Sequence, residues 1–151
     1  MARSSRQAGG VWPVIILDTN VFSALMPPKP VAAVVAWLDQ FPADRLWITS
    51  ITCFEIEFGI ALLAAGRRRT ELHAAFARLV ADYLEERVLD FDRAAASAAA
   101  ILAARRQRVG KSTAVRDMQI AGIVAARRAR LATRNGRHFD GMGLELVNPW
   151  E

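Results

Sequence analysis

The stretch VIILDTNVFSALM, residues Val14 to Met26, places a carboxylate at the point where an apolar run ends. Val14 to Leu17 are consecutive apolar residues, a pattern typical of a short strand buried on both faces of a sheet. Asp18 follows at once, with Thr19 and Asn20 behind it, before a second apolar segment begins. An acid in this position often serves only as a helix N-cap. Its role therefore depends on which polar residues the fold brings beside it.

The rest of the chain predicts short apolar strands that alternate with helices. Further strands are expected over 46–49, 88–89, 130–133 and 144–147, the last at an edge. Helices are expected over about 30–41, 51–66, 70–85, 93–108 and 112–128. We expect Thr49 or Ser50, then Asp92, and then Ser112 or Thr113 to cap three of these helices, and Arg67 to Arg69 to lie in a connection. Such alternation predicts one α/β domain whose parallel sheet is covered on both faces.

Composition limits the classes of protein to which the chain can belong. With 151 residues, of which 53% are hydrophobic and 23% charged, it is expected to form a single globular domain. The single cysteine, Cys53, excludes an internal disulfide framework, and we expect its thiol to be packed and inert. No apolar segment approaches the roughly 20 residues that span a membrane. We expect a cytoplasmic protein with a flexible arm over residues 1–12 and one domain over 13–151.

Basic residues are concentrated in one part of the chain. The net charge is +5, and arginine supplies 18 of the 20 basic residues. From Arg105 to Arg137 there are ten basic residues and one acid, Asp117. Arginine-rich stretches suit phosphate and indicate contact with nucleic acid or an acidic partner. A solvated helix face remains the alternative for such a run.

Four polar residues, remote in sequence, are predicted to meet at one edge of the sheet. Asp18 follows the first strand, Glu55 lies early in the helix after the second strand, Asp117 lies early in the helix before the fourth strand, and Asn135 follows the fourth strand. In open parallel sheets, sites form beyond the carboxyl ends of the strands. Taken singly, each residue has a structural alternative as a cap, a surface acid or a turn residue. The two histidines, His73 and His138, are interpreted as surface or packing residues.

Three neighbouring carboxylates repel one another unless a cation neutralises them. Oxygen-only ligands suit Mg²⁺ or Mn²⁺, and such a centre can activate water for phosphodiester hydrolysis. The expected metal ligands are Asp18, Glu55 and Asp117, with Asn135 as a fourth catalytic position. Short polar residues are available to orient water or the carboxylates, namely Thr19, Asn20, Thr49, Thr133 and Asn135.

Taken together, these motifs resemble a PIN domain, specifically a VapC-type toxin of the FitB-like branch. They are LDTNV (17–21), TSITCFEIEFGIALL (49–63), RDMQIAGIVAARR (116–128) and LATRNGRHFDGMGLELVNPW (131–150). Glu55, Gly59 and Asp117 match two acids and a glycine of the family. The resemblance implies a three-layer α/β/α sandwich with a parallel sheet of four or five strands and an Mg²⁺- or Mn²⁺-dependent endoribonuclease. It also implies a homodimer inhibited by a small antitoxin whose DNA-binding part represses the operon.

One position departs from the family pattern. FitB-like relatives often carry an acid after the Thr-Arg of the last motif, where this chain has Asn135, and Asp140 lies five residues further on. We therefore expect one well-held ion, bound chiefly by Asp18 and Asp117, rather than two.

The remaining surface roles follow from the same resemblance. Arg116, Arg134 and Arg137 adjoin the motifs and are candidates for contacts with RNA phosphates, with solubility or antitoxin docking as alternatives. Three apolar residues could form an antitoxin groove, although we expect them in the core: Phe58, Leu62 and Trp37.

Three other classes of protein are alternatives to this interpretation. A non-catalytic PIN-like module that binds RNA or a protein is the main alternative. A receiver domain would need a paired acid near the first strand, an acceptor aspartate after the third and a late lysine, whereas the only lysines are Lys29 and Lys111. A dehalogenase-like phosphatase would need a second acid at Asn20.

Overall fold

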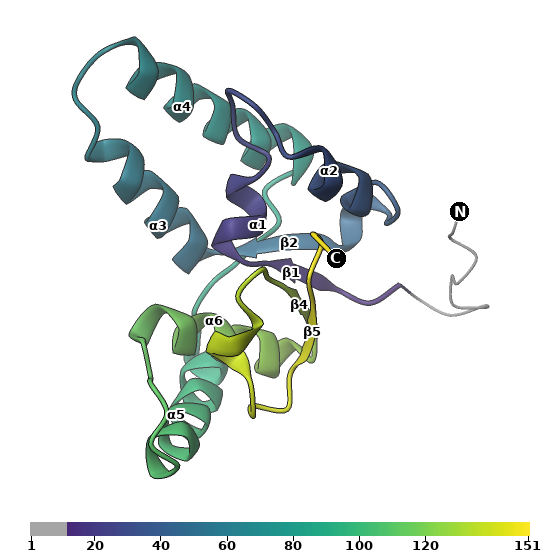
Figure 1. Ribbon diagram of the computed structural model, residues 1–151, viewed down its shortest axis with the longest axis vertical. Coiled ribbons are helices and arrows are strands. Elements are labelled where there is room, and N and C mark those ends of the chain that lie inside the picture. The colour runs from purple at the N-terminus through teal and green to yellow at the C-terminus, as the bar shows by residue number, and fades with distance from the viewer. Residues whose placement is uncertain (1–11) are drawn as a thin grey trace.

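Five parallel strands form one sheet between two layers of helices in the computed structural model, which describes residues 12–151 (Figure 1). The strands are β1 (Ile15–Leu17), β2 (Leu46–Thr49), β3 (Val88–Leu89), β4 (Arg130–Ala132) and β5 (Glu145–Val147). Their order is β3-β2-β1-β4-β5, and every neighbouring pair is parallel. The predicted α/β/α sandwich is confirmed, with all five strand candidates in the sheet.

The helices divide between the two faces of the sheet, each with its own core (Figure 1). One face carries α1 (Thr19–Ser23), α2 (Ala32–Leu38), α3 (Ser50–Ala61), α4 (Arg67–Arg78) and the π-helical turn η3 (Leu79–Tyr83); the other carries α5 (Arg93–Arg108) and α6 (Val115–Arg127). Short 3-10 turns occupy η2 (Ala43–Arg45) and η4 (Gly136–Phe139). Side chains of β1 alternate between the faces, because Ile15 and Leu17 join the first core and Ile16 the second.

Two helix caps are confirmed and three predicted boundaries are wrong. Thr49 Oγ1 accepts from Thr52 N at 3.1 Å, and Asp92 Oδ1 accepts from Ala95 N at 2.9 Å. Helix α3 ends at Ala61 rather than Gly66, and Arg67 to Arg69 form the first turn of α4 instead of a connection. Neither Ser112 nor Thr113 caps α6, which begins at Val115 without a side-chain cap.

Trp12, from the expected arm, and Cys53 both contact the body of the domain. Of the arm expected over residues 1–12, only Trp12 lies within the described residues, and its ring lies edge-on to Phe41 at 5.5 Å between centroids. Burial and nearby acids raise the pKa of Cys53 to about 11, so its thiol is protonated at neutral pH, in accord with a packed and inert residue. No helix within residues 12–151 has the length and apolar character needed to cross a membrane.

Helices α5 and α6 approach each other closely at Gly122. A Cβ atom there would lie 2.4 Å from the carbonyl oxygen of Ala95 and 2.6 Å from the Cβ of Ala99. The small residues of the alanine-rich helix therefore allow the close contact that seats α6, and with it Asp117, against the sheet.

Replacing Gly122 with alanine is expected to lower the free energy of unfolding by about 1–3 kcal/mol, because the methyl group forces two helix backbones apart. The matched control is Gly59→Ala in α3, where a Cβ would meet nothing within 4 Å, and there alanine should raise stability by about 0.5–1 kcal/mol. Urea denaturation of both variants measures the difference. Equal stabilities for the two variants would contradict the close contact.

Candidate active site at the carboxyl edge of the sheet

Asp18 lies at the point where the strand order reverses. Strand β1 sits between β2 and β4, and the main-chain N–H of Asp18 donates to the carbonyl of Ala132 at the end of β4 (2.9 Å). Crevices at such switch points are the usual sites of ligand binding in open parallel sheets. Asp18 is only 6% exposed, so its carboxylate requires partners.

The two carboxylate oxygens of Asp18 have different partners. Oδ1 accepts from the N–H of Thr19 at 2.8 Å, which caps α1. Oδ2 accepts from Thr133 Oγ1 at 2.7 Å and from Asn20 Nδ2 at 3.3 Å. Capping thus uses one oxygen, while Thr133 and Asn20 hold the other in a fixed orientation. The interpretation of Asp18 as a helix cap is confirmed.

The first turns of α3 place Glu55 beside the start of α1. Thr19 Oγ1 donates to Glu55 Oε1 at 2.5 Å and lies 3.0 Å from Thr52 Oγ1, and Arg116 Nη1 lies 3.6 Å from Glu55 Oε2. Thr52 is buried and was not anticipated from the sequence, because a threonine within an apolar helix gives no signal of its partner. Thr49 uses its hydroxyl oxygen to cap α3, as one of its two expected roles requires.

Asp117 lies in the first turn of α6 and contacts His138 of η4. His138 Nδ1 is 3.3 Å from Asp117 Oδ2. His138 is a half-exposed surface residue, as expected, and its contact with Asp117 was not anticipated from the sequence. A cavity of about 340 Å³ opens beside this pair. It is lined by Arg106, Ser112, Ala114, Asp117, Arg137 and His138.

Two residues of the last motif do not join the acids through their side chains. Asn135 is exposed, and no hydrogen bond among residues 12–151 links its side chain to an acid; its main-chain N–H donates to Thr133 Oγ1 at 3.0 Å. Asp140 accepts from Lys111 Nζ and Arg106 Nη1, each at 3.1 Å. These hydrogen bonds hold the pKa of Asp140 below its ordinary value. Asp140 therefore anchors a loop and is engaged away from Asp18.

The electrostatics of the site indicate an excess of negative charge. Burial raises the pKa of Asp18, and the charges of Asp117 and Glu55 raise it further, against the lowering effect of the bonds from Thr133 and Thr19. Burial likewise raises the pKa of Asp117, and Glu55 adds to this, whereas His138 and Arg106 lower it. A bound cation would relieve this mutual repulsion.

The donor set fits a hard divalent cation that keeps most of its water. All three acids offer oxygen atoms, which suit Mg²⁺ or Mn²⁺. Within the described part of the chain, no group of three or more Asp, Glu, His or Cys side chains is arranged to hold an ion directly. Mg²⁺ is commonly held by only one or two carboxylates, with waters and phosphate oxygens completing its shell, and Asp18 and Asp117 would be the two here.

Five of the ten basic residues between Arg105 and Arg137 form ion pairs with acids. The paired residues are Arg106 and Lys111 with Asp140, Arg116 with Glu55, Arg127 with Asp92, and Arg130 with Glu145. Three arginines lie near the acids, and one of them, Arg116, is the residue paired with Glu55. Arg116 lies over the rings of Phe54 and Phe58 (4.8 and 5.8 Å), Arg134 lies over Trp150 (4.6 Å), and Arg137 lines the cavity beside Asp117.

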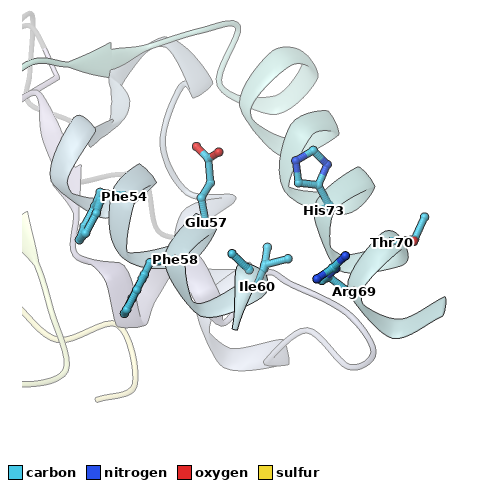
Figure 2. A pocket seen from close by; sticks show the side chains of 8 residues that line it. Phe54, Glu57, Phe58, Ile60, Arg69, Thr70 and His73 are labelled. Carbon is cyan, nitrogen blue, oxygen red and sulfur yellow. The ribbon is translucent and has the colours of Figure 1, made fainter. Parts of the chain in front are cut away.

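A second, larger cavity of about 680 Å³ lies between α3 and α4. Figure 2 shows Phe54, Glu57 and Phe58 on one helix and His73 on the facing one. Phe58 is 47% and Leu62 70% exposed, so the expectation that they belong to the core is wrong. Trp37 is partly buried against the core as expected. Glu57, two residues from Glu55, turns to this groove rather than to the acidic site.

Comparison with known proteins finds one family model and several similar proteins. The family model described as PIN domain matches residues 15–143. The chain is 38% identical over 138 residues to VapC ribonuclease Y4jK of Sinorhizobium fredii, covering 91% of this chain and 99% of the relative. It is 32% identical over 137 residues to Toxin FitB of Neisseria gonorrhoeae, with the same coverage. The crystal structure of FitAcB from Neisseria gonorrhoeae superposes with a TM-score of 0.83 at 32% identity, over 91% of this chain and 99% of that one.

Proposed function

The chain belongs to the PIN-domain family, and we propose that it is a metal-dependent endoribonuclease toxin of the VapC type, inhibited by a cognate antitoxin. The observation that carries the proposal is the oriented carboxylate of Asp18 at the switch point of the sheet, with Glu55 and Asp117 close enough to raise its pKa. The similarity to a named VapC ribonuclease and a named toxin supports the assignment of activity.

In this proposal Asp18 and Asp117 hold one Mg²⁺ or Mn²⁺ ion, and Glu55 holds it directly or through water. The bound ion supplies an activated water and neutralises charge on the phosphodiester. Thr133 and Asn20 keep Asp18 in its orientation, and Thr19 does the same for Glu55. Asn135 contributes through its main-chain N–H, which fixes the hydroxyl of Thr133.

The arginines near the acids hold the RNA backbone. Arg116 and Arg134 are held over aromatic rings, so their guanidinium groups lose little further freedom when they meet a phosphate. Arg137 lies in the cavity beside Asp117 and has no ion pair with a described acid. These contacts are independent of base identity and should make RNA binding depend on salt.

The groove between α3 and α4 accommodates the antitoxin. Exposed apolar side chains at Phe54, Phe58 and Leu62 form a surface that an amphipathic segment of a partner would cover. The groove adjoins the acidic site through Arg116, which contacts both Phe54 and Glu55. We further assign the toxin to a homodimer in the cytoplasm, which reaches operator DNA through the antitoxin.

Purified protein free of antitoxin should cleave RNA in Mg²⁺ or Mn²⁺, lose cleavage in excess EDTA, and regain it when either ion is restored. Gel analysis of a transfer-RNA pool and a messenger RNA measures this, with single-stranded DNA as the control substrate. RNA binding without cleavage in any divalent ion would contradict the proposal and support a non-catalytic PIN-like module.

A further inference from the structure

A histidine contacts one of the acids assigned to the metal, and nothing in the proposed mechanism uses it. His138 Nδ1 lies 3.3 Å from Asp117 Oδ2. Two ligands about 2.1 Å from a shared ion lie about 3.0 Å apart at an octahedral centre and about 3.4 Å apart at a tetrahedral one. The observed separation therefore lies within the range of a nitrogen and an oxygen that share one ion.

The surroundings keep His138 in this place. Arg106 is only 6% exposed; its Nε donates to the carbonyl of Ser112 at 2.9 Å and its Nη1 to the carbonyl of Asp140 at 2.8 Å. One buried guanidinium thus joins the segment that precedes α6 to the loop that follows η4. Asp117 in α6 and His138 in η4 adjoin these two segments, so the bonds of Arg106 help to fix their relative position.

The cavity beside the pair gives an ion open positions for water or substrate. It holds about 340 Å³, and His138, which is half exposed, is one of the residues that line it. Arg106 and Arg137 also line it, so an anion, such as a phosphate of the substrate, is favoured next to the cation. A cation there meets Asp117 and His138 on one side and an anionic group on the other.

We infer that His138 is a nitrogen ligand of the acidic site, next to Asp117, and that it shifts the preference of the site from Mg²⁺ toward transition-metal ions. Imidazole suits Zn²⁺, Ni²⁺ and Co²⁺, whereas Mg²⁺ favours oxygen ligands. The inference takes its setting from the proposed metal-dependent function, but its test does not require RNA cleavage.

The test measures the binding of Co²⁺ and of Mg²⁺ to the full chain, without RNA, by isothermal titration calorimetry at neutral pH. We expect His138→Ala to weaken Co²⁺ binding by about tenfold or more while Mg²⁺ affinity changes by less than about threefold. His138→Asp should lower the ratio of Co²⁺ to Mg²⁺ affinity, since it supplies oxygen in place of nitrogen. The matched control is His73→Ala, because His73 is the only other histidine and lies on α4, in the groove.

A spectroscopic readout identifies the ligand directly. With two histidines in the chain, substoichiometric Co²⁺ should shift or broaden the ring signals of His138 in a ¹H–¹⁵N spectrum and leave those of His73 in place. His138 is half exposed, so its variants should remain folded, which circular dichroism checks.

A purely electrostatic role for His138 predicts a different change in metal affinity. If His138 serves only as a charge partner of Asp117, its removal frees the carboxylate, and affinity for Co²⁺ and Mg²⁺ should rise together or stay equal; this would overturn the inference. Co²⁺ bound through His138 in a protein that never cleaves RNA would uphold the inference while removing the proposed function.

Discussion

Asp18→Asn is expected to lower the rate of RNA cleavage by about three orders of magnitude, because a metal centre is worth several kcal/mol and loses its best-oriented ligand. The neutral amide keeps one oxygen for the Thr19 N–H but places an NH₂ group, which cannot bind a cation, where the second carboxylate oxygen meets Thr133. Cleavage of a labelled RNA in Mg²⁺ or Mn²⁺, compared with wild type at equal concentration, measures the effect. Asp44→Asn, an exposed acid in the turn η2 before β2, is the matched control.

The same substitution should not unfold the protein, and its effect on stability depends on pH. Burial raises the pKa of Asp18 above its ordinary value of 3.8, so the folded state binds this proton more tightly than the unfolded state does. Wild type therefore carries an unfavourable charge at pH 7, a cost that disappears as the pH falls through the raised pKa toward 3.8. We expect Asp18→Asn to be more stable than wild type at pH 7, with the difference shrinking near pH 4, as urea denaturation at both values would measure.

Two results would count against this account of Asp18. Full cleavage by Asp18→Asn would remove the residue from the proposed site. Lower stability of the variant at pH 7 would mean that the hydrogen bonds from Thr133 and Thr19 outweigh the cost of burying the charge.

Phe58→Ala is expected to weaken antitoxin binding by about 30-fold or more, the effect of about 2 kcal/mol at an interface hot spot. Phe58 is 47% exposed and stacks on Phe54, with ring centroids 5.7 Å apart, at the edge of the groove between α3 and α4. An antitoxin segment seated there would bury both rings. Calorimetric titration of the toxin with its cognate antitoxin measures the affinity directly.

The control for the groove is another exposed apolar residue. Ile101 on α5 is 55% exposed and lies on the other side of the sheet, so Ile101→Ala should bind the antitoxin as wild type does. The antitoxin concentration that halves RNA cleavage, referred to the uninhibited rate of each variant, gives a second readout. Equal affinities for the two variants would place the antitoxin elsewhere on the surface.

Much of the fold could be predicted because its signals are local. The apolar run of β1, the alternation of strands with helices, and the caps at Thr49 and Asp92 depend on residues close together in the chain. The errors fell at helix ends, where distant contacts decide. Before α6, Arg106 Nε donates a hydrogen bond to the carbonyl of Ser112. This bond keeps Ser112 in a loop instead of the helix.

The sequence by itself determined that Asp18, Glu55 and Asp117 lie at one edge of a parallel sheet, because each stands at a strand end or in a helix start that parallel topology directs to that edge. Only the tertiary structure decided their partners. The directions of the His138 and Asn135 side chains depend on contacts with segments far apart in the chain. The pairing of each arginine with an acid depends on such contacts too. Periodicity carries no information about these directions, whereas packing and hydrogen bonding across the sheet edge set them.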